Sequence, residues 1–290
     1  MGVQFRQVVI IGVGLIGGSL GLVLKQKGLA KSVVGVGRRI ENLELGVKLH
    51  AIDRYETQVR HAVQDADLVV LATPVQTYAG HLREWGGALC PGAVVSDVGS
   101  VKGSLVVEAE ELVPAGVHFV GAHPIAGREK SGVAYASADL FQGARCLVTP
   151  TKRTDPQALD KICQLWEAAG SLILSMDPFV HDWVLGAVSH LPHVAAFGLM
   201  HALHDLQEQM EVPVDLLEYS GGGLRDTTRI AASSAEMWRD IGLANRKNLV
   251  HMIENYIQHL KKFKSLLEKG DEAGLAEALN KAKELRERLK

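Results

Sequence analysis

The feature that most constrains the fold is a set of four short apolar runs in the first half of the chain, each of which ends abruptly in a loop. The runs cover residues 8–11, 68–71, 94–95 and 118–120. Short β-branched runs that alternate with helical patterns predict βαβ units and a parallel sheet. The carboxyl ends of parallel strands share one edge, where ligands bind. We therefore expect Ser100 and His123, which follow the last two runs, to lie beside whatever the first loop binds.

This alternation continues to about residue 176 and predicts an α/β domain with a doubly wound, Rossmann-type sheet over residues 1–176. Strands are expected at 8–11, 33–36, 68–71, 93–96 and 118–121, with a helix at 14–27. Two later runs, at 145–148 and 171–176, flank a helix for which Asp155 is the expected N-cap and Pro156 the first residue. We expect these two strands at the far edge of the same sheet.

The character of the chain changes at Asp177-Pro178, after which no run resembles a strand. Long helices are expected at 181–205, with an interruption at Pro192, then at 243–267 and 272–289, with a break at the glycines 221–223. Residues 177–290 should therefore form an all-helical domain. Because a thin layer of long apolar helices would expose much apolar surface, we expect this domain to form a homodimer.

Composition excludes several classes of protein. The net charge of −2 gives no reason to expect nucleic acid or an anionic membrane as a partner. Cys90, Cys146 and Cys163 have no CxxC spacing, which argues against a disulfide framework and favours a reducing compartment. The first strand starts too close to Met1 for a leader peptide, and no apolar stretch approaches the ~20 residues that span a bilayer. We expect a cytoplasmic protein.

The first loop has the pattern of a dinucleotide-binding site. Gly12-x-Gly14-x-x-Gly17 follows an apolar strand and opens a helix, the context that the motif requires. Its glycines permit the turn, the approach of the pyrophosphate and the packing of helix on strand, and the helix N-terminus binds the phosphate. The alternative is a glycine-rich turn without a ligand. The expected cofactor-binding residues are Gly12, Gly14, Leu15, Ile16, Gly17, Arg38, Arg39, Thr73 and Pro74.

The end of the second strand bears on the choice of nicotinamide cofactor. An acid usually stands there to bind the ribose 2′-hydroxyl of NAD, but here the position is Gly37, and Arg38 and Arg39 follow it. An arginine pairs with a 2′-phosphate, whereas a carboxylate repels it. The sequence favours NADP or the use of both NAD and NADP, unless the two arginines are only solvated surface charges.

Two motifs in the helical part contain groups that could bind a ligand. His190-Leu-Pro-His193 has histidines three residues apart, as do His201 and His204, but no carboxylate lies at ligand spacing, so we expect no metal. The run from Gly221 to Arg229 combines flexible backbone N–H groups with guanidinium groups, which suits the capture of an anion. A helix cap with a surface ion pair is the alternative for that run.

Together these motifs resemble one family. The glycine loop, Asp97-x-x-Ser100-Val-Lys102, Gly121-Ala-His123-Pro, His190-Leu-Pro-His193 and Arg225-Asp226-x-Thr228-Arg229 occur in the order found in the prephenate/arogenate (cyclohexadienyl) dehydrogenases of tyrosine biosynthesis. The resemblance covers essentially the whole chain and implies a Rossmann domain joined to a helical dimerisation domain. It also implies hydride transfer from the ring to NAD or NADP, with loss of the ring carboxylate as carbon dioxide. Many NAD-using members have an acid where Gly37 stands.

The resemblance implies roles for individual residues. A neutral His123 would accept a hydrogen bond from the ring hydroxyl, and Ser100 resembles its orienting partner near the nicotinamide. Arg229 resembles a substrate-binding arginine, and His193 a second substrate contact. Further substrate-site candidates are Asp226, which would hold an arginine in place, Glu129, at the pocket mouth, and Trp238, which would line the pocket.

Other functions remain open on the sequence. L-arogenate, with an amino group in place of the keto group, is a substrate that no residue here excludes. A β-hydroxyacid or imine-reducing dehydrogenase typically relies on a lysine in the first long helix of the second domain, and residues 181–205 contain none. A non-catalytic nicotinamide sensor would need the glycine loop, but not Ser100, His123 and Arg229 together.

Overall fold

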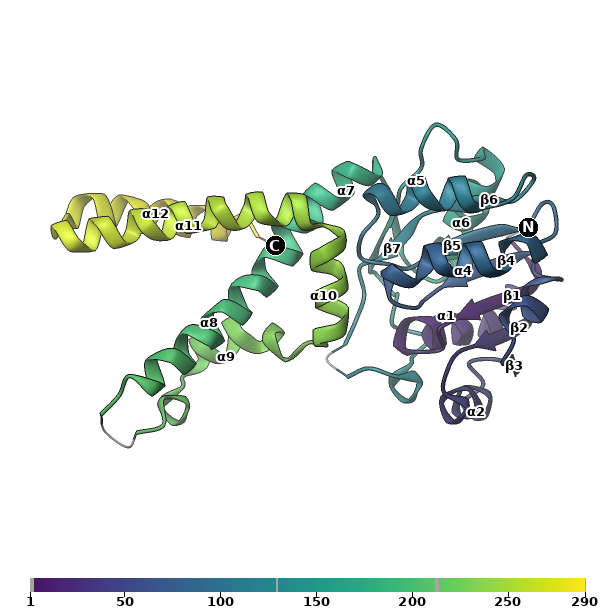
Figure 1. The fold of residues 1–290 in the computed structure, drawn as a ribbon, viewed down its shortest axis with the longest axis horizontal. Helices are drawn as coiled ribbons and strands as arrows, with labels where there is room; N and C mark the ends of the chain where they lie inside the picture. The colour runs from purple at the N-terminus through teal and green to yellow at the C-terminus, as the bar shows by residue number, and fades with distance from the viewer. Residues whose placement is uncertain (1–2, 129, 212–213, 290) are drawn as a thin grey trace.

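The computed structural model describes residues 3–128, 130–211 and 214–289, and it divides into an α/β part and a helical part (Figure 1). The α/β part contains a six-stranded parallel sheet in the order β3-β2-β1-β4-β5-β6. Its strands are β1 (Phe5–Ile11), β2 (Ala30–Val36), β3 (Arg54–Glu56), β4 (Leu68–Leu71), β5 (Val94–Asp97) and β6 (His118–Val120). This is the strand order of a doubly wound Rossmann sheet, which confirms the predicted fold class.

Helices cover both faces of this sheet. The alternating side chains of β1 divide between two apolar cores, with Val8 and Ile10 in one and Val9 and Ile11 in the other. The helices of this part are α1 (Leu15–Gln26), α2 (Ile40–Lys48), α3 (Val59–Val63), α4 (Tyr78–Trp85), α5 (Gly103–Leu112) and α6 (Pro156–Ala168). α1 and α6 contribute to the first core, and α3, α4 and α5 to the second. Burial on both faces explains why these strands are apolar runs rather than alternating patterns.

The two late strands do not extend the main sheet, so that prediction is wrong. β8 (Arg145–Val148) and β9 (Leu172–Ser175) join β7 (Ala122–Pro124) in a separate three-stranded sheet, with β7 antiparallel to β8. The chain passes from β6 to β7 through Gly121 alone, where an added Cβ would lie 2.5 Å from the Thr149 hydroxyl and 2.8 Å from Val106. As a result His123 lies in a strand, opposite Leu147, rather than in a loop.

The second part is all-helical over the described residues, as predicted. It contains α7 (Pro178–Leu185), α8 (Leu191–Glu208), α9 (Gly222–Thr228), α10 (Ala235–Ala244), α11 (Arg246–Lys269) and α12 (Glu272–Glu287). A π-helical turn, Gly186–His190, joins α7 to α8, so the interruption expected at Pro192 lies just before that proline. The helix predicted at 243–267 is divided at Asn245, and the glycines expected to break the chain are the cap and first turn of α9.

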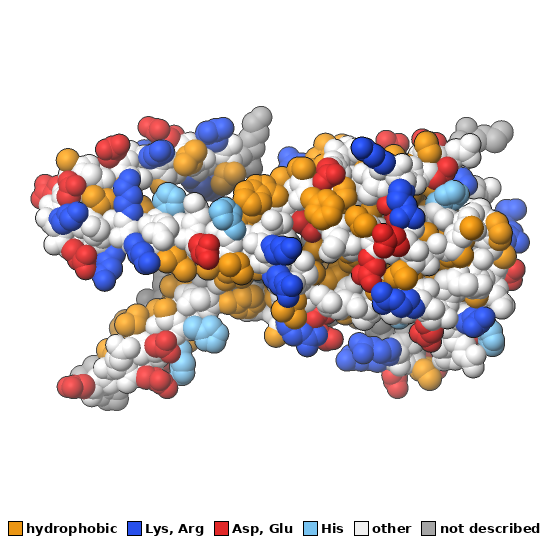
Figure 2. All heavy atoms as spheres, turned by 45° about the horizontal axis from the view of Figure 1, so that its top comes forward, with side chains coloured by type: hydrophobic (Ala, Val, Ile, Leu, Met, Phe, Trp, Pro, Cys, Tyr) orange, Lys and Arg blue, Asp and Glu red, His pale blue; other side chains and the backbone are white. Residues whose placement is uncertain are grey.

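The helical part extends away from the α/β part as two arms, one formed by α8 and α9 and the other by α11 and α12 (Figure 1). Hydrophobic side chains gather where these arms meet (Figure 2). Elsewhere along the helical part large apolar side chains are also exposed, and Val188, Leu206 and Val250 are each more than half exposed. Within the described residues, Pro178–Glu208 is long and apolar enough to cross a membrane by length and composition alone, with 22% of its most apolar window buried. This corrects the expectation that no such stretch exists, because residues 183–204 contain no Asp, Glu, Lys or Arg.

Candidate active site

The glycine loop joins β1 to α1 and is shaped by close backbone contacts. Gly12 has φ +100°, and an added Cβ would lie 2.5 Å from the carbonyl oxygen of Ala72. Gly17 also has no room for a side chain, because its Cβ would collide with the carbonyl oxygen of Gly12. Gly14 differs, since nothing lies within 4 Å of the place where its Cβ would be. The loop is therefore fixed at two glycines and open at the third.

The open side of this loop suits a pyrophosphate. Gly14 is the N-cap of α1, so the backbone N–H groups of Leu15, Ile16 and Gly17 form the first turn and have no intrahelical acceptor. These groups and the helix dipole bind anions. Asn42 of α2 donates a 2.6 Å hydrogen bond to the carbonyl of Val13 and holds the loop in place. The predicted glycines are thus arranged as a dinucleotide-binding loop requires.

The loop after β2 carries the residues expected to select the cofactor. Arg38 and Arg39 are both exposed, and Arg39 is the N-cap of α2. A Cβ at Gly37 would make only an ordinary contact, 3.4 Å from Leu43. Steric exclusion therefore does not explain why this position lacks a carboxylate.

Thr73 and Pro74 follow β4, the neighbour of β1 in the sheet, and lie beside the glycine loop. The backbone N–H of Ala72 donates to the carbonyl of Ile11 over 2.8 Å, and Ala72 is also the residue against which Gly12 packs. The Thr73 side chain is half-buried, and its hydroxyl lies 2.8 Å from that of Thr77. These residues lie at the point where the strand order reverses, which is where doubly wound sheets bind ligands.

A buried ion pair organises the loop after β5, which carries Ser100. Lys102 Nζ lies 2.6 Å from Asp97 Oδ2, and both side chains are fully buried. Lys102 Nζ also donates to the carbonyl of Gly99 over 2.6 Å, while Asp97 accepts from the backbone N–H groups of Gly99 and Ala122. The pair therefore joins the Ser100 loop to β7. Its positioning role was not foreseen, although the two residues were part of the motif.

His123 is held by a chain of side chains that the sequence analysis did not foresee. Its Nδ1 lies 2.9 Å from Nε2 of His181, and Nδ1 of His181 lies 2.9 Å from Oδ1 of Asp182. His123 is 8% exposed and His181 fully buried. Among the described residues, the side chain hydrogen-bonded to His123 is that of His181, and no hydrogen bond links the side chains of His123 and Ser100. The adjacent His-Asp at the start of α7 was the available signal.

The surroundings of His123 favour a neutral imidazole. Burial lowers its pKa well below the ordinary value of 6.5, and the positive charge of Lys102 and the nearby His181 and His190 act in the same direction. A neutral ring is the form that can accept a hydrogen bond or a proton. The site can therefore supply a base at the sheet edge without an additional charged group.

Three aromatic side chains gather on the helical side of the site. His193 stacks on Trp238 with ring centroids 3.7 Å apart, and His190 meets the same indole edge-on at 5.8 Å. His193 donates through Nδ1 to the carbonyl of Ser189 over 2.9 Å if it is neutral, which leaves its Nε2 as an acceptor. Burial lowers the pKa of His193, and the charge of Arg229 adds to this effect. His193, Trp238 and Arg229 are therefore close together, as a shared substrate site requires.

The remaining substrate-site candidates are Asp226, Arg229 and Glu129. Asp226 is exposed on α9 and Arg229 begins the 3-10 turn that follows, Arg229–Ala232. Glu129 lies outside the described residues. His201 and His204 are exposed on α8, and the described residues contain no group of three or more side chains that could hold a metal ion.

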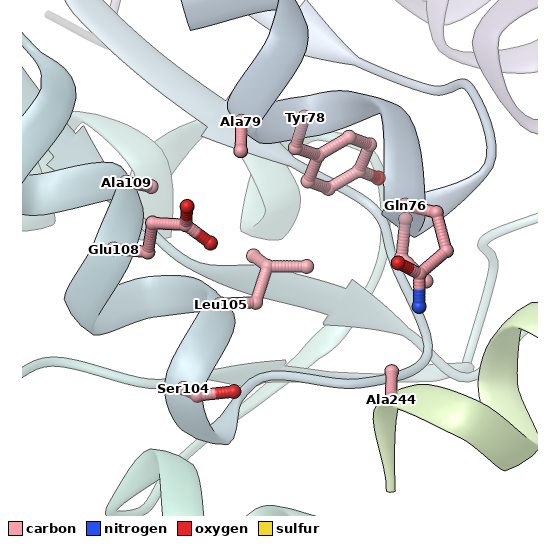
Figure 3. A pocket seen from close by; sticks show the side chains of 9 residues that line it. Gln76, Tyr78, Ala79, Ser104, Leu105, Glu108, Ala109 and Ala244 are labelled. Atoms are coloured by element: carbon pink, nitrogen blue, oxygen red, sulfur yellow. The ribbon is translucent and has the colours of Figure 1, made fainter.

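A separate cavity of about 310 Å³ lies between α4, α5 and the junction of α10 with α11 (Figure 3). Gln76, Leu105, Glu108 and Ala244 are among the residues that line it. None of the residues predicted to form the site lines this cavity, so it is distinct from the sheet edge where His123 lies.

Comparisons with known proteins cover almost the whole chain. It matches the models for the nucleotide-binding domain of prephenate dehydrogenase over residues 20–175 and for the dimerization domain of prephenate dehydrogenase over residues 177–281. It is 34% identical over 283 residues to a prephenate dehydrogenase of Bacillus subtilis, covering 97% of this chain and 76% of that protein. It is 33% identical to a cyclohexadienyl dehydrogenase of Zymomonas mobilis, covering 99% and 97% of the two chains. A crystal structure of prephenate dehydrogenase from A. aeolicus, in complex with hydroxyphenyl propionate and NAD+, has a TM-score of 0.91 and 38% identity over 99% of both chains.

Proposed function

Since the chain belongs to the prephenate dehydrogenase family, we propose that this site carries out the oxidative decarboxylation of prephenate to 4-hydroxyphenylpyruvate. The chain is an NAD(P)-dependent dehydrogenase. A bound NAD or NADP would supply the hydride acceptor, and the loop from Gly12 to Gly17 fits its pyrophosphate because Gly14 is open and the N–H groups in the first turn of α1 have no intrahelical acceptor. The observation that carries the proposal is the position of His123, buried at the same edge of the sheet, where burial lowers its pKa.

The chemistry needs little more than orientation and one proton acceptor. Loss of the ring carboxylate as carbon dioxide makes the ring aromatic, which drives the reaction forward. His123 accepts the hydrogen bond of the ring hydroxyl and strengthens the push of electron density toward the departing hydride. Ser100, half-buried on the loop that Asp97 and Lys102 fix, is proposed to contact the nicotinamide side of the site.

The two substrate carboxylates need cationic or hydrogen-bonding partners. Arg229 provides a guanidinium group for a charge-assisted pair, and His193, held by Ser189 and Trp238, provides a second contact. Asp226 is proposed to hold an arginine in place rather than to touch an anionic substrate. Trp238 is proposed to form one wall of the substrate site.

Cofactor preference is proposed to favour NADP or to include both cofactors. Gly37 has space for a side chain but carries no carboxylate, and the exposed Arg38 and Arg39 follow it, so we propose that they bind a 2′-phosphate. Arg38→Ala should weaken binding of NADP with little change for NAD, measured by the KM for each cofactor. Arg60→Ala, on the neighbouring helix α3, is a matched control on another exposed arginine. Unchanged NADP binding in Arg38→Ala would contradict this assignment.

Assembly as a homodimer is proposed from the exposed apolar side chains of the two arms. A second copy would cover the apolar stretch Pro178–Glu208, whose Asp182 and His190 make hydrogen bonds inside the protein. Light scattering at micromolar concentration should give the mass of a dimer, and a monomer would refute the assembly.

We also propose that the boundary between the two domains lies between residues 176 and 177, and that the protein is cytoplasmic.

The decisive experiment is an assay of purified protein with prephenate and either NAD or NADP, followed by the absorbance of reduced nicotinamide. Turnover supports the proposed reaction, and the ratio of rates with the two cofactors tests the role of Arg38. L-arogenate is the second candidate substrate, favoured if only that compound turns over. Absence of turnover with both compounds and both cofactors would refute the function.

A further inference from the structure

The hydrogen-bond chain from His123 to Asp182 crosses from one part of the protein to the other. His123 belongs to β7 of the α/β part, whereas His181 and Asp182 belong to α7, the first helix of the helical part. The proposed reaction uses only one nitrogen of His123, so the function of the other two residues is not yet explained. Their geometry determines where the proton of His123 is held.

Asp182 determines which nitrogen of His181 carries a proton. Its Oδ1 accepts a 2.7 Å hydrogen bond from the backbone N–H of Lys102, and the same oxygen is 2.9 Å from Nδ1 of His181. A carboxylate only accepts hydrogen bonds, so Nδ1 of His181 carries a proton and donates it. An added Cβ at Gly103 would lie 2.5 Å from the other carboxylate oxygen, which shows how closely Asp182 is seated.

The tautomer of His123 follows from that of His181. Burial lowers the pKa of His181, and the charge of Lys102 lowers it further, against the opposing effects of Asp182 and Asp97. A neutral His181 that donates from Nδ1 has an unprotonated Nε2, which must accept. Among the described residues, the hydrogen-bond partner of that nitrogen is Nδ1 of His123, 2.9 Å away. Nδ1 of His123 must therefore donate the hydrogen bond.

We propose that His181 and Asp182 are positioning residues that hold the proton of His123 on Nδ1 and so keep its Nε2 as the acceptor for the ring hydroxyl. This inference rests on the proposed function of the site. A His123 with its proton on Nε2 would present a donor to the substrate hydroxyl and could not take its proton. Because α7 supplies both residues, the helical part sets the protonation state of a base in the other part.

The direct test reads the tautomer without any turnover. Protein labelled with ¹⁵N-histidine is examined by NMR at pH 7.5 through the two-bond couplings of the imidazole rings, and His123→Asn assigns the His123 signals. We expect His123 to carry its proton on Nδ1. A proton on Nε2 would overturn the proposal whatever the activity. Loss of turnover on both candidate substrates would instead refute the proposed function and leave the tautomer reading valid.

Two substitutions of His181 separate positioning from simple packing. Gln keeps a hydrogen-bond acceptor near the place of Nε2, whereas Leu has similar bulk and no acceptor. His181→Leu should lower kcat by about 100-fold or more with little change in KM, the size expected when a general base is lost. His181→Gln should recover most of that loss. The same two changes at the exposed His201 of α8 are the control and should leave kcat unaltered.

Two results would show that His181 serves packing alone. One is an equal loss of kcat in His181→Gln and His181→Leu, accompanied by an equal loss of thermal stability. The other is a His123 tautomer in His181→Leu that is the same as in the unchanged protein. The tautomer of the unchanged protein still decides the proposal if His181→Leu does not fold.

Discussion

Replacing His190 by Asn should make the stability of this protein less dependent on pH. His190 is 1% exposed, and its Nδ1 lies 3.1 Å from Nδ2 of Asn245. The same Asn245 nitrogen donates to the backbone carbonyl of Asp182 over 2.8 Å, so it is the amide donor and Nδ1 of His190 is the acceptor. Protonation of that nitrogen would bury a charge and remove the hydrogen bond.

The size of the effect follows from the pKa of His190. Burial lowers this pKa from 6.5 to about 4. The unfolded chain therefore takes up the proton first, and stability that is complete above pH 6.5 is lost as the pH falls toward 4. Between pH 8 and pH 5 these two pKa values correspond to a loss of about 2 kcal/mol in the free energy of unfolding.

Urea unfolding at pH 8 and at pH 5, at one protein concentration, measures the effect. His190→Asn keeps an acceptor near the place of Nδ1 but cannot titrate, so its stability should fall by about 2 kcal/mol less than that of the unchanged protein. His201→Asn is the control, because it removes another histidine at an exposed position of α8 rather than at a buried one. An equal pH dependence in His190→Asn and in the unchanged protein would refute the reasoning.

Four further outcomes are expected. Lys102→Met leaves the Asp97 carboxylate buried without its partner and should lower the free energy of unfolding, measured in urea, by about 3–5 kcal/mol. Adding Asp97→Asn to that variant should restore part of the loss. Equal losses in the single and double variants would exclude an electrostatic cause. His123→Asn should lower kcat by about 10²–10⁴-fold with little change in KM, and parallel losses of binding and turnover would contradict a role as base. Arg229→Ala should raise the KM for prephenate by about 10–100-fold in steady-state assays, and an unchanged KM would remove Arg229 from the substrate site. Because the pKa of His123 is lowered, kcat/KM should be constant above pH 6.5 and fall only at lower pH, and an acid limb centred above 6.5 would argue against His123.

Local sequence patterns were sufficient to predict much of the α/β part. The glycine spacing from Gly12 to Gly17 is a local requirement of the turn between β1 and α1, and the structure gives each of its glycines a distinct place. Asp155 caps α6 through a 2.8 Å hydrogen bond from the N–H of Ala158, with Pro156 in the first turn, as the sequence indicates. Such features involve residues only a few positions apart, so the sequence contains them explicitly.

The second sheet could not be predicted in the same way. The runs at 145–148 and 171–176 show that strands form, but an apolar strand can pair with either sheet. Gly121 decides the outcome, because its missing side chain lets the chain pass closely over Thr149 and enter β7 beside β8. That contact depends on the position of a residue 28 places further along the chain.

The sequence by itself determined that a Rossmann-type sheet precedes a helical domain, and its motifs predict that His123, His193 and Arg229 bind or act on the substrate. Only the tertiary structure decided how His123 is held, because His181 lies 58 residues away and no periodicity, spacing or cap connects the two. The physical reason is the range of the interactions involved. Caps, turns and apolar periods act over a few residues, whereas the tautomer of a buried imidazole depends on which distant donors and acceptors the packed fold places against it.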